Sequence, residues 1–598
     1  MPLHYPHLFG GRISDWIRFL ARFLRLAGPY WTSAEKWRIW LLTFLLIVLT
    51  AGQVALAIAF NSWYENFFDA LEKRVLARFL LLIGLLLLII AGTAGVTTIH
   101  LLIKRRIQIS WRDWLTRRVV NEWMTSGRHY QVAQIPGDHD NPDGRIAEDI
   151  RITAEYAIDL AHSLFYCLLL LISFTQILWR LSGPPELRYG GLDLYIPGHM
   201  VWVALIYSAA GSAIALMLGW PLIRAANTRQ SAEANFRFGL VRTRENSLAI
   251  ALLSGEADER RGLRDLFRGA IAAWDRQSYA LARLMFFSSS WSILSQVFPI
   301  LVAAPRYIVG AITLGVLMQT AQAFQQAVAA LSWPIDNLSK AAEWRASVER
   351  VERLHDAVND LTSRHPADAP LTITVEPDGR PSLAFIDCAI NDPDGRPVIA
   401  SFRTEIRAGE RVLITGDLGA AVKLFKAVAG LWPWGRGRIT LPSNGDIFFL
   451  PQRPYVPLGT LGEAVCYPTD PKTCNVETIH HALQRAGLED LIPRLGKREP
   501  WEQSLSLDDL QRLAFARLLL HHPRWIFLQE ATSSLDAVGK AAMMALLREN
   551  FPDATVITID PDPALAAFHR RHLTLVRTNH VVHFAEKAVD RDALAPSV

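Results

Sequence analysis

Long apolar stretches dominate the first 335 residues of the chain. A bilayer core about 30 Å thick is crossed by a helix of about 20 mostly apolar residues. Stretches of roughly this kind lie at 40–60, 79–99, 163–179, 201–223, 284–305 and 307–335, and residues 160–162 can extend the third. The pattern predicts six transmembrane helices, because the buried helices of a water-soluble protein would not repeat so many uncharged stretches.

Basic residues predict which end of each span faces the cytoplasm, because Lys and Arg are enriched in cytoplasmic loops. They gather before the first span and after the second and fourth, at Arg12, Arg18, Arg22 and Arg25, at Lys104, Arg105, Arg106, Arg112, Arg117 and Arg118, and at Arg224, Arg229, Arg237, Arg242 and Arg244. The connections at 61–78, 181–200 and 306 are short and poorer in charge. We therefore expect both termini in the cytoplasm.

The segments on the predicted cytoplasmic side have helical patterns. Residues 13–26 place apolar side chains at helical spacing with arginines between them. This is typical of a helix lying among lipid headgroups, and a plain amphipathic linker helix is the alternative. Loops 104–159 and 224–283 have helical composition. At 1.5 Å per residue, such helices would run tens of ångströms past the membrane and reach a soluble domain.

Glutamines interrupt the last apolar stretch. Gln319, Gln322 and Gln326 fall at i, i+3 and i+7, on one face of a helix. Amides in lipid are costly without partners, so this stripe faces either a polar cavity or a neighbouring helix. Both alternatives stay open. Acidic residues are placed at the outer end of the first hairpin (61–78), so no proton relay across the membrane is evident.

The rest of the chain has the pattern of a soluble α/β domain. Its entry is rich in proline, at Pro366, Pro370, Pro377 and Pro381, which is typical of a linker. An apolar strand at 411–415 then leads into a glycine turn and a helix at 424–431, which is the context of a phosphate-binding loop. We predict an interfacial segment (1–36), a six-helix membrane domain (37–350), a linker (351–382), an α/β domain (383–585) and a tail (586–598).

Composition narrows the class of protein. Charged residues make up only 20% of the chain, below the quarter or so of a soluble domain. The four cysteines show no paired metal spacing and are too few for a disulfide-stapled fold, so no metal site is expected. The net charge of +5 is spread through the membrane half, which does not indicate a nucleic-acid partner.

Several longer strings carry a family resemblance. They stand at 141–150, 236–238, 244–246 and 255–256 in the membrane half, and at 429–433, 449–455, 511–517 and 530–536 in the soluble half. Over nearly its whole length the chain resembles an ATP-binding-cassette half-transporter of the SbmA/BacA-related branch, near the subfamily D acyl transporters. The resemblance implies a permease fused to a P-loop-type nucleotide-binding domain, with ATP and Mg²⁺ as cofactors.

The P-loop departs from the family pattern. Such a loop works because glycine backbone N–H groups cradle phosphates, a Lys pairs with the outer phosphates and a Ser or Thr holds Mg²⁺. Gly416 and Gly419 are retained, but Ala421, Val422 and Lys423 stand where the resemblance places glycine, Lys and Ser or Thr. A one-residue slip would bring Lys423 toward the phosphates and still leave Mg²⁺ without its hydroxyl ligand.

The Walker B strand at 524–530 is also altered. It should end in an aspartate that fixes the metal, but Gln529 is neutral, whereas Mg²⁺ prefers carboxylate and phosphate oxygens. Glu530 occupies the general-base position, and a base without its metal has little to act on. Positions that keep the residue type implied by the resemblance are Gln452, Ser506, Glu530 and Asp536.

The signature and switch positions are substituted as well. Asp508 replaces the signature glycine and places a carboxylate beside a polyanion. The switch histidine is replaced by Asp560 and Pro561, and proline offers neither an imidazole nor an N–H. Removing one preorganised charge stabiliser costs on the order of 3 kcal/mol. Four damaged positions therefore predict a site that does not turn over.

These observations predict a multi-pass transporter of the cassette family in the bacterial inner (cytoplasmic) membrane, with a degenerate ATP site. The resemblance implies a second half-transporter subunit, and a homodimer is favoured because Val422 and Asp508 would damage both composite sites of a heterodimer. The expected solute is a peptide or another large amphipathic molecule. One alternative is a non-transporting membrane scaffold or regulator, and another is a transporter driven by an ion gradient.

Overall fold

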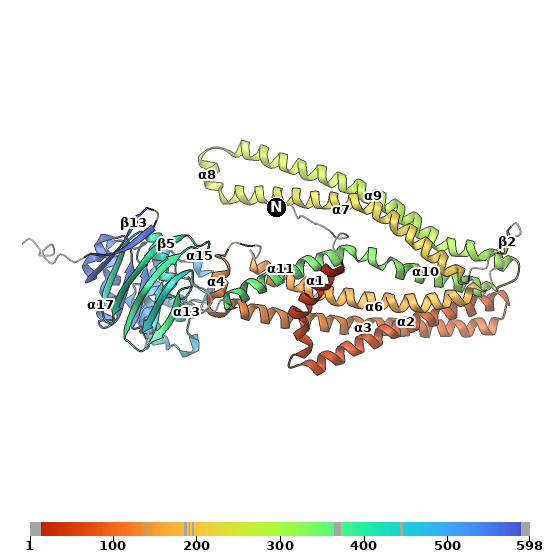
Figure 1. The fold of residues 1–598 in the computed structure, drawn as a ribbon, viewed down its shortest axis with the longest axis horizontal. Coiled ribbons are helices and arrows are strands. Elements are labelled where there is room, and N and C mark those ends of the chain that lie inside the picture. Colours follow the sequence, from red (N-terminus) through yellow and green to blue (C-terminus); the bar gives the residue numbers. More distant parts are fainter. Residues whose placement is uncertain are drawn as a thin grey trace, which may run out of the picture. The chain divides into compact units, whose positions relative to one another are not determined.

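The computed structural model describes residues 13–135, 137, 141–183, 188–189, 192–193, 197–363, 372–442, 446–579 and 581–587. The chain forms two compact units (Figure 1). Unit 1 comprises Met1–Val120 and Asn141–His355, and unit 2 comprises Asn121–Asp140 and Asp356–Val598. Arg12, Pro366, Pro370 and the predicted tail beyond 587 lie outside the described residues.

Unit 1 is built of helices, with one short hairpin. Its elements are α1 (Ile13–Ala27), η1 (Gly28–Thr32), α2 (Lys36–Glu72), α3 (Leu76–Met124, its last turn in unit 2), α5 (Pro142–Gly144), η3 (Arg145–Asp149), α6 (Ile150–Ser182), β1 (Arg188–Tyr189), β2 (Leu192–Asp193), α7 (His199–Glu245), α8 (Ser247–Leu252), α9 (Glu256–Ile308), α10 (Leu314–Asp336) and α11 (Leu338–Ser363, its end in unit 2).

Five helices of the described residues are long and apolar enough to cross a membrane, by length and composition. They are α2, α3, the run Pro142–Ser182 that ends in α6, α7 and α9. The predicted sixth span at 307–335 is not among them, and its start was placed wrongly. Helix α9 continues through Pro305 to Ile308, and the chain turns at Gly310, where φ is 75°. Thr313 then caps α10 by accepting a hydrogen bond from the Val316 amide.

Helix α10, which is not among these five, is enclosed by other helices of unit 1. It packs against α2, α6, α7 and α9. Phe324 is fully buried and belongs to the same core as Phe174 and Leu178 of α6, while Ala323 and Ala327 let the neighbouring backbones approach closely. A helix covered by other helices does not need a lipid-facing apolar surface, which is consistent with the glutamines that interrupt its apolar stretch.

Helices α7 and α9 form a long hairpin closed by α8 (Figure 1). They contain 47 and 53 residues, or about 70 and 80 Å at 1.5 Å per residue, far more than a bilayer core requires. The helical extensions expected at 224–283 are therefore present. In the other long loop, α3 continues to Met124 and α6 begins at Ile150.

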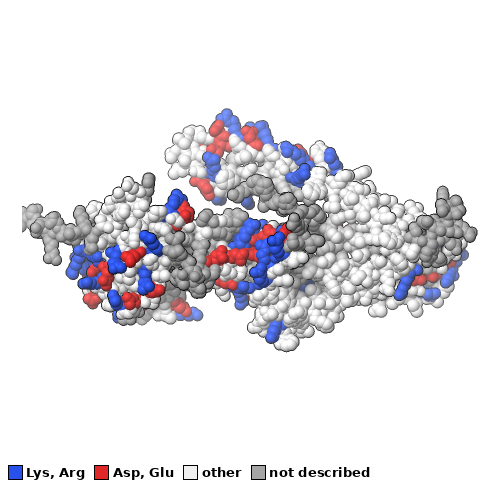
Figure 2. Space-filling model, in the orientation of Figure 1, with Lys and Arg blue, Asp and Glu red and all other residues white. Residues whose placement is uncertain are grey.

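Charge is unevenly distributed over unit 1. Figure 2 shows a broad face over α2, α6, α9 and α10 with neither Lys and Arg nor Asp and Glu, and charged side chains gathered on either side of it. Large apolar side chains of α2 and α3 are exposed, among them Phe44, Leu81 and Leu88. Such an uncharged apolar band is what a membrane-spanning unit presents to lipid.

Helix α1 uses both of its apolar faces. Phe19 and Phe23 are buried against Trp344 of α11, and Phe23 also contacts Trp111 of α3. Ile17 and Leu24 point outward and are 62% and 60% exposed. One face of α1 thus packs on the protein and the other is exposed, and its place among lipid headgroups stays a prediction.

Unit 2 centres on a ten-stranded sheet with the order β3-β7-β4-β5-β14-β13-β6-β12-β11-β8. The strands of unit 2 are β3 (Thr374–Asp378), β4 (Ser382–Asn391), β5 (Pro397–Arg407), β6 (Arg411–Gly416), β7 (Gly435–Pro442), β8 (Ile447–Leu450), β9 (Gly459–Thr460), β10 (Arg498–Glu499), β11 (Trp525–Gln529), β12 (Thr555–Ile559), β13 (Arg571–Thr578) and β14 (Val581–Lys587). Strands β8, β11, β12, β6 and β13 are parallel.

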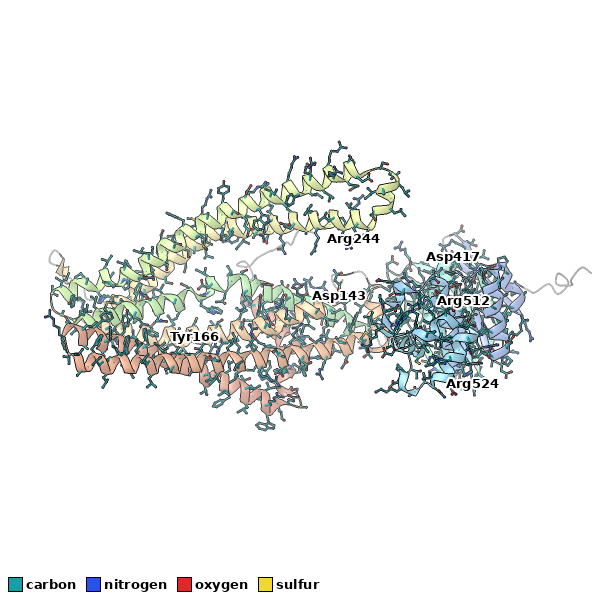
Figure 3. All side chains as sticks on the ribbon, turned by 180° about the vertical axis from the view of Figure 1, so that it is seen from behind. Asp143, Tyr166, Arg244, Asp417, Arg512 and Arg524 are labelled. Atoms are coloured by element: carbon teal, nitrogen blue, oxygen red, sulfur yellow. The ribbon has the colours of Figure 1, made fainter. Side chains whose placement is uncertain are left out.

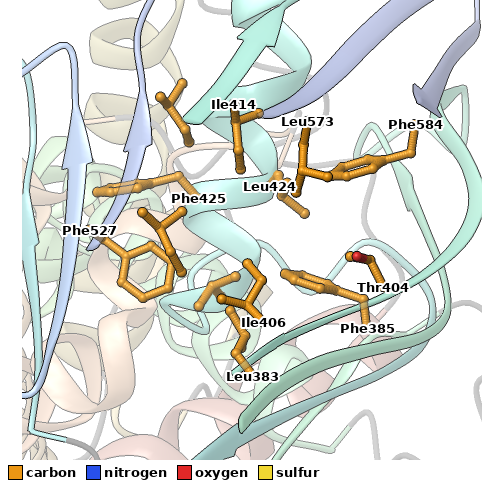
Figure 4. Close-up of a pocket in the computed structure, with 13 residues that line it drawn as sticks. Leu383, Phe385, Thr404, Ile406, Ile414, Leu424, Phe425, Phe527, Leu573 and Phe584 are labelled. Carbon is orange, nitrogen blue, oxygen red and sulfur yellow. The ribbon is translucent and has the colours of Figure 1, made fainter. Parts of the chain in front are cut away.

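The helices of unit 2 pack on this sheet and on one another. They are η2 (Thr125–Gly127), α4 (Arg128–Val132), α12 (Leu418–Val428), α13 (Leu461–Cys466), η4 (Pro471–Thr473), α14 (Val476–Arg485), η5 (Glu489–Arg494), α15 (Trp501–Ser504), α16 (Leu507–His521), α17 (Ala537–Asn550) and η6 (Pro563–Phe568). Leu424 and Phe425 of α12 reach into the core and line a cavity of about 10 Å³ (Figure 4). Its walls are apolar except for Thr404, which does not favour a bound water.

Two elements occupy parts of the predicted linker at 351–382. Helix α11 continues to Ser363 because Val351, Leu354 and Val358 repeat at helical spacing, and these side chains are buried. Strand β3 then begins at Thr374 and pairs with β7. A helix and a strand thus occupy parts of the predicted linker, and the division between the units at His355 and Asp356 lies within α11.

Candidate functional site

Parallel strands bring the distant motifs of unit 2 together. Strands β6, β12, β11 and β8 are adjacent and parallel. Their carboxyl ends lead to the glycine turn at 416–419, to Asp560 and Pro561, to Glu530 and to Gln452 respectively. The carboxyl ends of parallel strands meet at one edge of a sheet, which is where α/β proteins bind ligands.

Gly416 closes strand β6. Its φ is +99°, and a Cβ atom at this position would lie 2.1 Å from the carbonyl oxygen of Leu575 on β13. Only glycine fits such a backbone conformation beside a neighbouring strand. The retained glycine is therefore explained by the sheet itself, with or without a phosphate at the turn.

Asp417 caps the helix that follows. Its Oδ1 accepts a hydrogen bond from the Ala420 amide at 3.0 Å, and its Oδ2 lies 2.6 Å from Nε of Arg577 on β13. The Arg577 guanidinium and these backbone N–H groups hold the pKa of Asp417 below its usual range. An anion at a helix N-terminus would use these same donors. Here a carboxylate of the chain, that of Asp417 (labelled in Figure 3), already occupies the N-terminus of α12.

Sequence reasoning missed Asp417 and Arg577. An aspartate directly before an apolar helical run is a recognisable N-cap. The glycine turn was predicted without a role for this aspartate. Arg577 could not have been found, because only the pairing of β13 with β6 brings it beside a residue 160 positions earlier.

Lys423 points away from the glycine turn. Its Nζ lies 2.5 Å from Oδ1 of Asp392, in the turn between β4 and β5, and 5.5 Å from the centre of the Trp432 ring. The slip that would bring this ammonium to a phosphate is not adopted. Ala421 is fully buried and Val422 half-buried, so neither of these positions offers a polar group to a ligand.

Glu530 and Gln452 do meet. Nε2 of Gln452 donates a hydrogen bond to Oε2 of Glu530 at 3.2 Å. Gln511, on α16, donates to the backbone carbonyls of both residues and so fixes their separation. Gln529 supplies an amide at the end of β11, where a metal would need a carboxylate. Burial, and then the nearby Asp560 carboxylate, raise the pKa of Glu530.

Two carboxylates, of Asp560 and Asp562, lie at the switch position. Asp560 is 4% exposed, and burial raises its pKa. Its Oδ1 accepts a hydrogen bond from the Asp562 amide at 2.9 Å. Asp562 in turn pairs with Lys540 of α17 at 2.6 Å. Pro561 stands between the two aspartates and donates nothing.

The signature segment folds into a closed cap. Ser506 caps the N-terminus of α16, and its Oγ donates to Oδ2 of Asp509 at 2.7 Å while accepting a hydrogen bond from the Asp509 amide. Asp508 pairs with Arg512 at 3.0 Å. The Ser506 hydroxyl thus has a partner within its own helix, and the segment presents carboxylates. Asp536 plays a similar local part, because it caps α17 by accepting from the Gly539 amide at 2.7 Å.

These positions do not fit ATP with Mg²⁺ as the resemblance would require. A carboxylate caps the helix that should receive the phosphates, and the available ammonium, of Lys423, is engaged elsewhere. The metal position holds a neutral amide at Gln529. Asp417 and Lys423 therefore have partners within unit 2 in place of a phosphate.

The glutamine stripe of α10 faces a neighbouring helix. Nδ2 of Asn61, on α2, donates to the Gln319 carbonyl at 3.1 Å and also to the Gln322 side chain. Asn61 is fully buried and Gln319 is 6% exposed. These contacts and the burial of Gln319 favour the packing alternative for Gln319 and Gln322, and the expected cavity stays a prediction. No contact of the Gln326 side chain assigns it to either alternative among the described residues.

The acidic residues at the end of α2 also have structural partners. Oδ1 of Asp69 accepts a hydrogen bond from the Gly315 amide, and Oε2 of Glu72 accepts one from the Leu314 amide, both at 3.0 Å. The first N–H groups of a helix lack partners within that helix. These two carboxylates supply them at the start of α10.

A segment of the first long loop belongs to unit 2. Nε2 of Gln131, on α4, donates to the Gly430 carbonyl at 3.1 Å, and Nζ of Lys426 lies 5.3 Å from the centre of the Tyr130 ring. Tyr130 and Ile135 pack against the core formed below α12. The string 429–433 that carried the family resemblance is thus part of this contact.

Comparison with known proteins places these features in context. Residues 24–308 match the family described as ABC transporter transmembrane region 2. The inner membrane ABC transporter ATP-binding protein YddA of Escherichia coli (strain K12) is 30% identical over 558 residues, which are 91% of this chain and 96% of that protein. ABC transporter D family member 2, chloroplastic, of Arabidopsis thaliana is 26% identical over 96% of this chain and 88% of that protein.

A solved structure shares the fold. The structure of a bacterial Atm1-family ABC exporter with ATP bound aligns with a TM-score of 0.65 at 17% identity, over 92% of this chain and 94% of that one. At this identity the likeness concerns the arrangement of helices and strands. It supports a helical membrane domain followed by a curled-sheet domain, as predicted.

Proposed function

Because this chain belongs to the ABC transporters, we propose that it is a half-transporter of the bacterial inner membrane that moves peptides or another large amphipathic solute. It is a multi-pass membrane protein with an exporter-type fold and relatives in subfamily D. The inner membrane is supported by the name of the Escherichia coli relative. The solute class rests on the resemblance to the SbmA/BacA-related branch, and the cytoplasmic termini rest on the basic loops.

We further propose that unit 2 does not bind or hydrolyse ATP in the manner of its relatives. The observation that carries this proposal is the Asp417 carboxylate, which is hydrogen-bonded to the α12 amide and paired with Arg577. A phosphate entering here would meet a fixed negative charge and lose two of its donors. Glu530 keeps the general-base position, but the neutral Gln529 beside it does not supply the carboxylate that a metal needs.

A homodimer is the assembly that we propose. The family's sites combine one subunit's P-loop with the other subunit's signature segment. In a heterodimer with an intact partner, Val422 would damage one site and Asp508 the other. An intact partner would therefore restore neither composite site. We propose that the second subunit is another copy of this chain.

The test is Mg-ATP binding by the full-length protein in lipid discs, measured by calorimetry. We expect no binding by the wild type up to about 1 mM. Binding should appear in a variant carrying Ala421→Gly, Val422→Lys, Lys423→Ser and Gln529→Asp, and should become tighter when Asp417→Ser is added. Micromolar binding by the wild type would contradict the proposal, since Lys423 would then have to leave Asp392.

Two single substitutions test whether the effect on ATP binding depends on the position of the Asp417 carboxylate. The alternative is that removing any negative charge from unit 2 has the same effect. Asp417→Ser alone removes the internal anion and should not restore binding without the Lys and Asp replacements. Asp394→Ser removes a carboxylate from an exposed turn of the same unit, where it pairs only with its neighbour Arg396. If Asp394→Ser improved binding in the restored variant as much as Asp417→Ser, the position of the carboxylate would not matter.

The same internal partners favour a second candidate, a non-transporting membrane scaffold or regulator. Uptake of a labelled peptide into proteoliposomes separates the possibilities. Uptake that requires ATP would contradict both a scaffold and the proposed loss of ATP binding. Uptake driven by a proton gradient alone would support a gradient-driven transporter, and no uptake under any condition would support the scaffold.

A further inference from the structure

Two cysteines lie together in the helical part of unit 2. Cys466 ends α13 and is fully buried, and Cys474 follows η4 and is partly exposed. Both belong to one apolar cluster, in which Cys474 packs against the buried residues. Their spacing in the sequence does not match a paired metal site.

The chain between them folds back on itself. The Thr469 amide donates to the Cys466 carbonyl at 2.9 Å, and the Thr473 amide donates to the Asp470 carbonyl at 3.0 Å. These turns return Cys474 to the end of α13. Helix η4 packs against α13, and burial together with the neighbouring Cys474 thiol raises the pKa of Cys466 to about 12.

The same loop contacts the segment that follows Gln452. Arg517 of α16 donates to the Ala464 carbonyl at 2.8 Å and to the Tyr455 carbonyl at 2.9 Å. Its guanidinium also lies 5.6 Å from the centre of the Tyr467 ring. Tyr467 directly follows Cys466, so a change in the loop at 467–473 acts on groups that hold Tyr455.

We propose that Cys466 and Cys474 form a reversible disulfide when the protein meets a hydroperoxide. The partly exposed Cys474 sulfur attacks one peroxide oxygen, which breaks the O–O bond, releases water and leaves a sulfenic acid. The Cys466 sulfur then attacks the Cys474 sulfur, and the second water leaves. Two thiols and one hydrogen peroxide thus give one disulfide and two waters.

The division of labour follows from access. Oxidation begins at a thiol that solvent reaches, and a buried thiol held protonated is a poor first nucleophile. Cys466 therefore acts as the resolving residue, already in place beside the sulfenic acid. An external dithiol reverses the reaction by attacking Cys474, the sulfur that it can reach.

The disulfide would fix the loop between α13 and α14. A covalent link across 467–473 removes the freedom of that segment and holds Tyr467 against Arg517. Cys388 and Cys167 lack this arrangement, since Cys388 lies in the other core of unit 2 and Cys167 in α6 of unit 1. They serve as internal controls in the same protein.

The test uses the full-length protein in lipid discs, treated with hydrogen peroxide and then alkylated and mapped by mass spectrometry. We expect a peptide pair joined through Cys466 and Cys474, loss of these two thiols from alkylation, and recovery of both after dithiothreitol. Hydrogen exchange at 467–473 should slow at least tenfold in the oxidised form. Cys388→Ala should behave like the wild type.

Three results would overturn the proposal. One is oxidation of Cys474 to sulfinic or sulfonic acid while Cys466 remains alkylatable. Another is a disulfide that joins Cys474 to a second copy of the chain. The third is an unchanged thiol count in the wild type. Because the mapping is done on the wild type, the result does not depend on whether Cys466→Ala or Cys474→Ser folds.

Discussion

Asp417 makes two interactions that a bound phosphate would also make, an amide hydrogen bond at a helix N-terminus and an ion pair with a guanidinium. Its side chain is only 17% exposed, whereas that of Arg577 is 55% exposed. The cap therefore lies in a partly dry environment, and the charge pair is screened on one side. The Asp417 carboxylate thus satisfies the donors of the glycine turn without a bound phosphate.

Replacing Asp417 should loosen the start of α12. For Asp417→Ala we expect a loss of about 1 kcal/mol of local stability, as for other N-cap residues. This corresponds to about fivefold faster hydrogen exchange of the amides at 418–428 at pH 7. Asp417→Asn keeps a capping oxygen and should lose less. Equal exchange in wild type and Asp417→Ala would show that the cap carries no stability.

The effect of Asp417→Asn should depend on pH. The Arg577 pair lowers the folded-state pKa of Asp417, so its stabilisation is complete above the unfolded pKa of about 3.9 and disappears as the pH falls through the folded pKa. The difference between wild type and Asp417→Asn should therefore shrink below about pH 4. Comparing both proteins at each pH cancels the intrinsic change in exchange rate.

Asp560 and Asp562 should respond in opposite directions. The folded-state pKa of Asp560 is raised by burial, so the carboxylate opposes folding at neutral pH and stops doing so below about pH 4. Asp560→Asn keeps the oxygen that accepts from the Asp562 amide, and it should raise the unfolding midpoint at pH 7. Asp562→Asn breaks the pair with Lys540 and should cost about 0.5 kcal/mol. A lower midpoint for Asp560→Asn would contradict this assignment.

At the scale of the elements, the surroundings of a helix decide which of its side chains are buried. Helix α10 is surrounded by other helices of unit 1, and two of its glutamines contact Asn61 there. Helix α8, in contrast, carries large apolar side chains that are exposed. Leu248, Leu252 and Leu253 at and beside it are 74%, 77% and 82% exposed, at the closed end of the α7–α9 hairpin. Clustered exposed leucines of this kind are typical of a surface that another chain covers.

We expect these leucines to contact the second copy in the proposed homodimer. Leu252→Glu with Leu253→Glu should weaken dimerisation at least tenfold, about 1.4 kcal/mol, as measured by mass photometry in detergent. Arg264→Glu, on the adjacent exposed part of α9, changes charge without removing apolar surface and serves as the control. A dimer unaffected by the leucine changes would place its interface elsewhere.

Across the whole molecule, architecture and chemistry have separated. Relatives match the chain over nearly its full length, and the apolar band, the long helical hairpin and the parallel sheet are all present. The groups that would hold a nucleotide are replaced by residues with partners inside unit 2. We propose that the chain keeps the architecture of its relatives without their ATP hydrolysis.

The sequence by itself determined the membrane half, the P-loop context and the altered motifs. Apolar stretches of membrane length and a strand–glycine–helix pattern are local signals, and local signals survive without knowledge of neighbours. It also showed that Gln529, Val422 and Pro561 lack the chemistry expected at their positions. These are properties of residue types, which need no coordinates.

Only the tertiary structure decided what took the place of the missing groups. The Asp417–Arg577 and Lys423–Asp392 pairs join residues 160 and 31 positions apart. The choice between a cavity and a packed interface for Gln319 depended on Asn61, 258 positions earlier. Such contacts depend on strand pairing and helix packing, which bring together side chains whose separation along the chain carries no periodic signal.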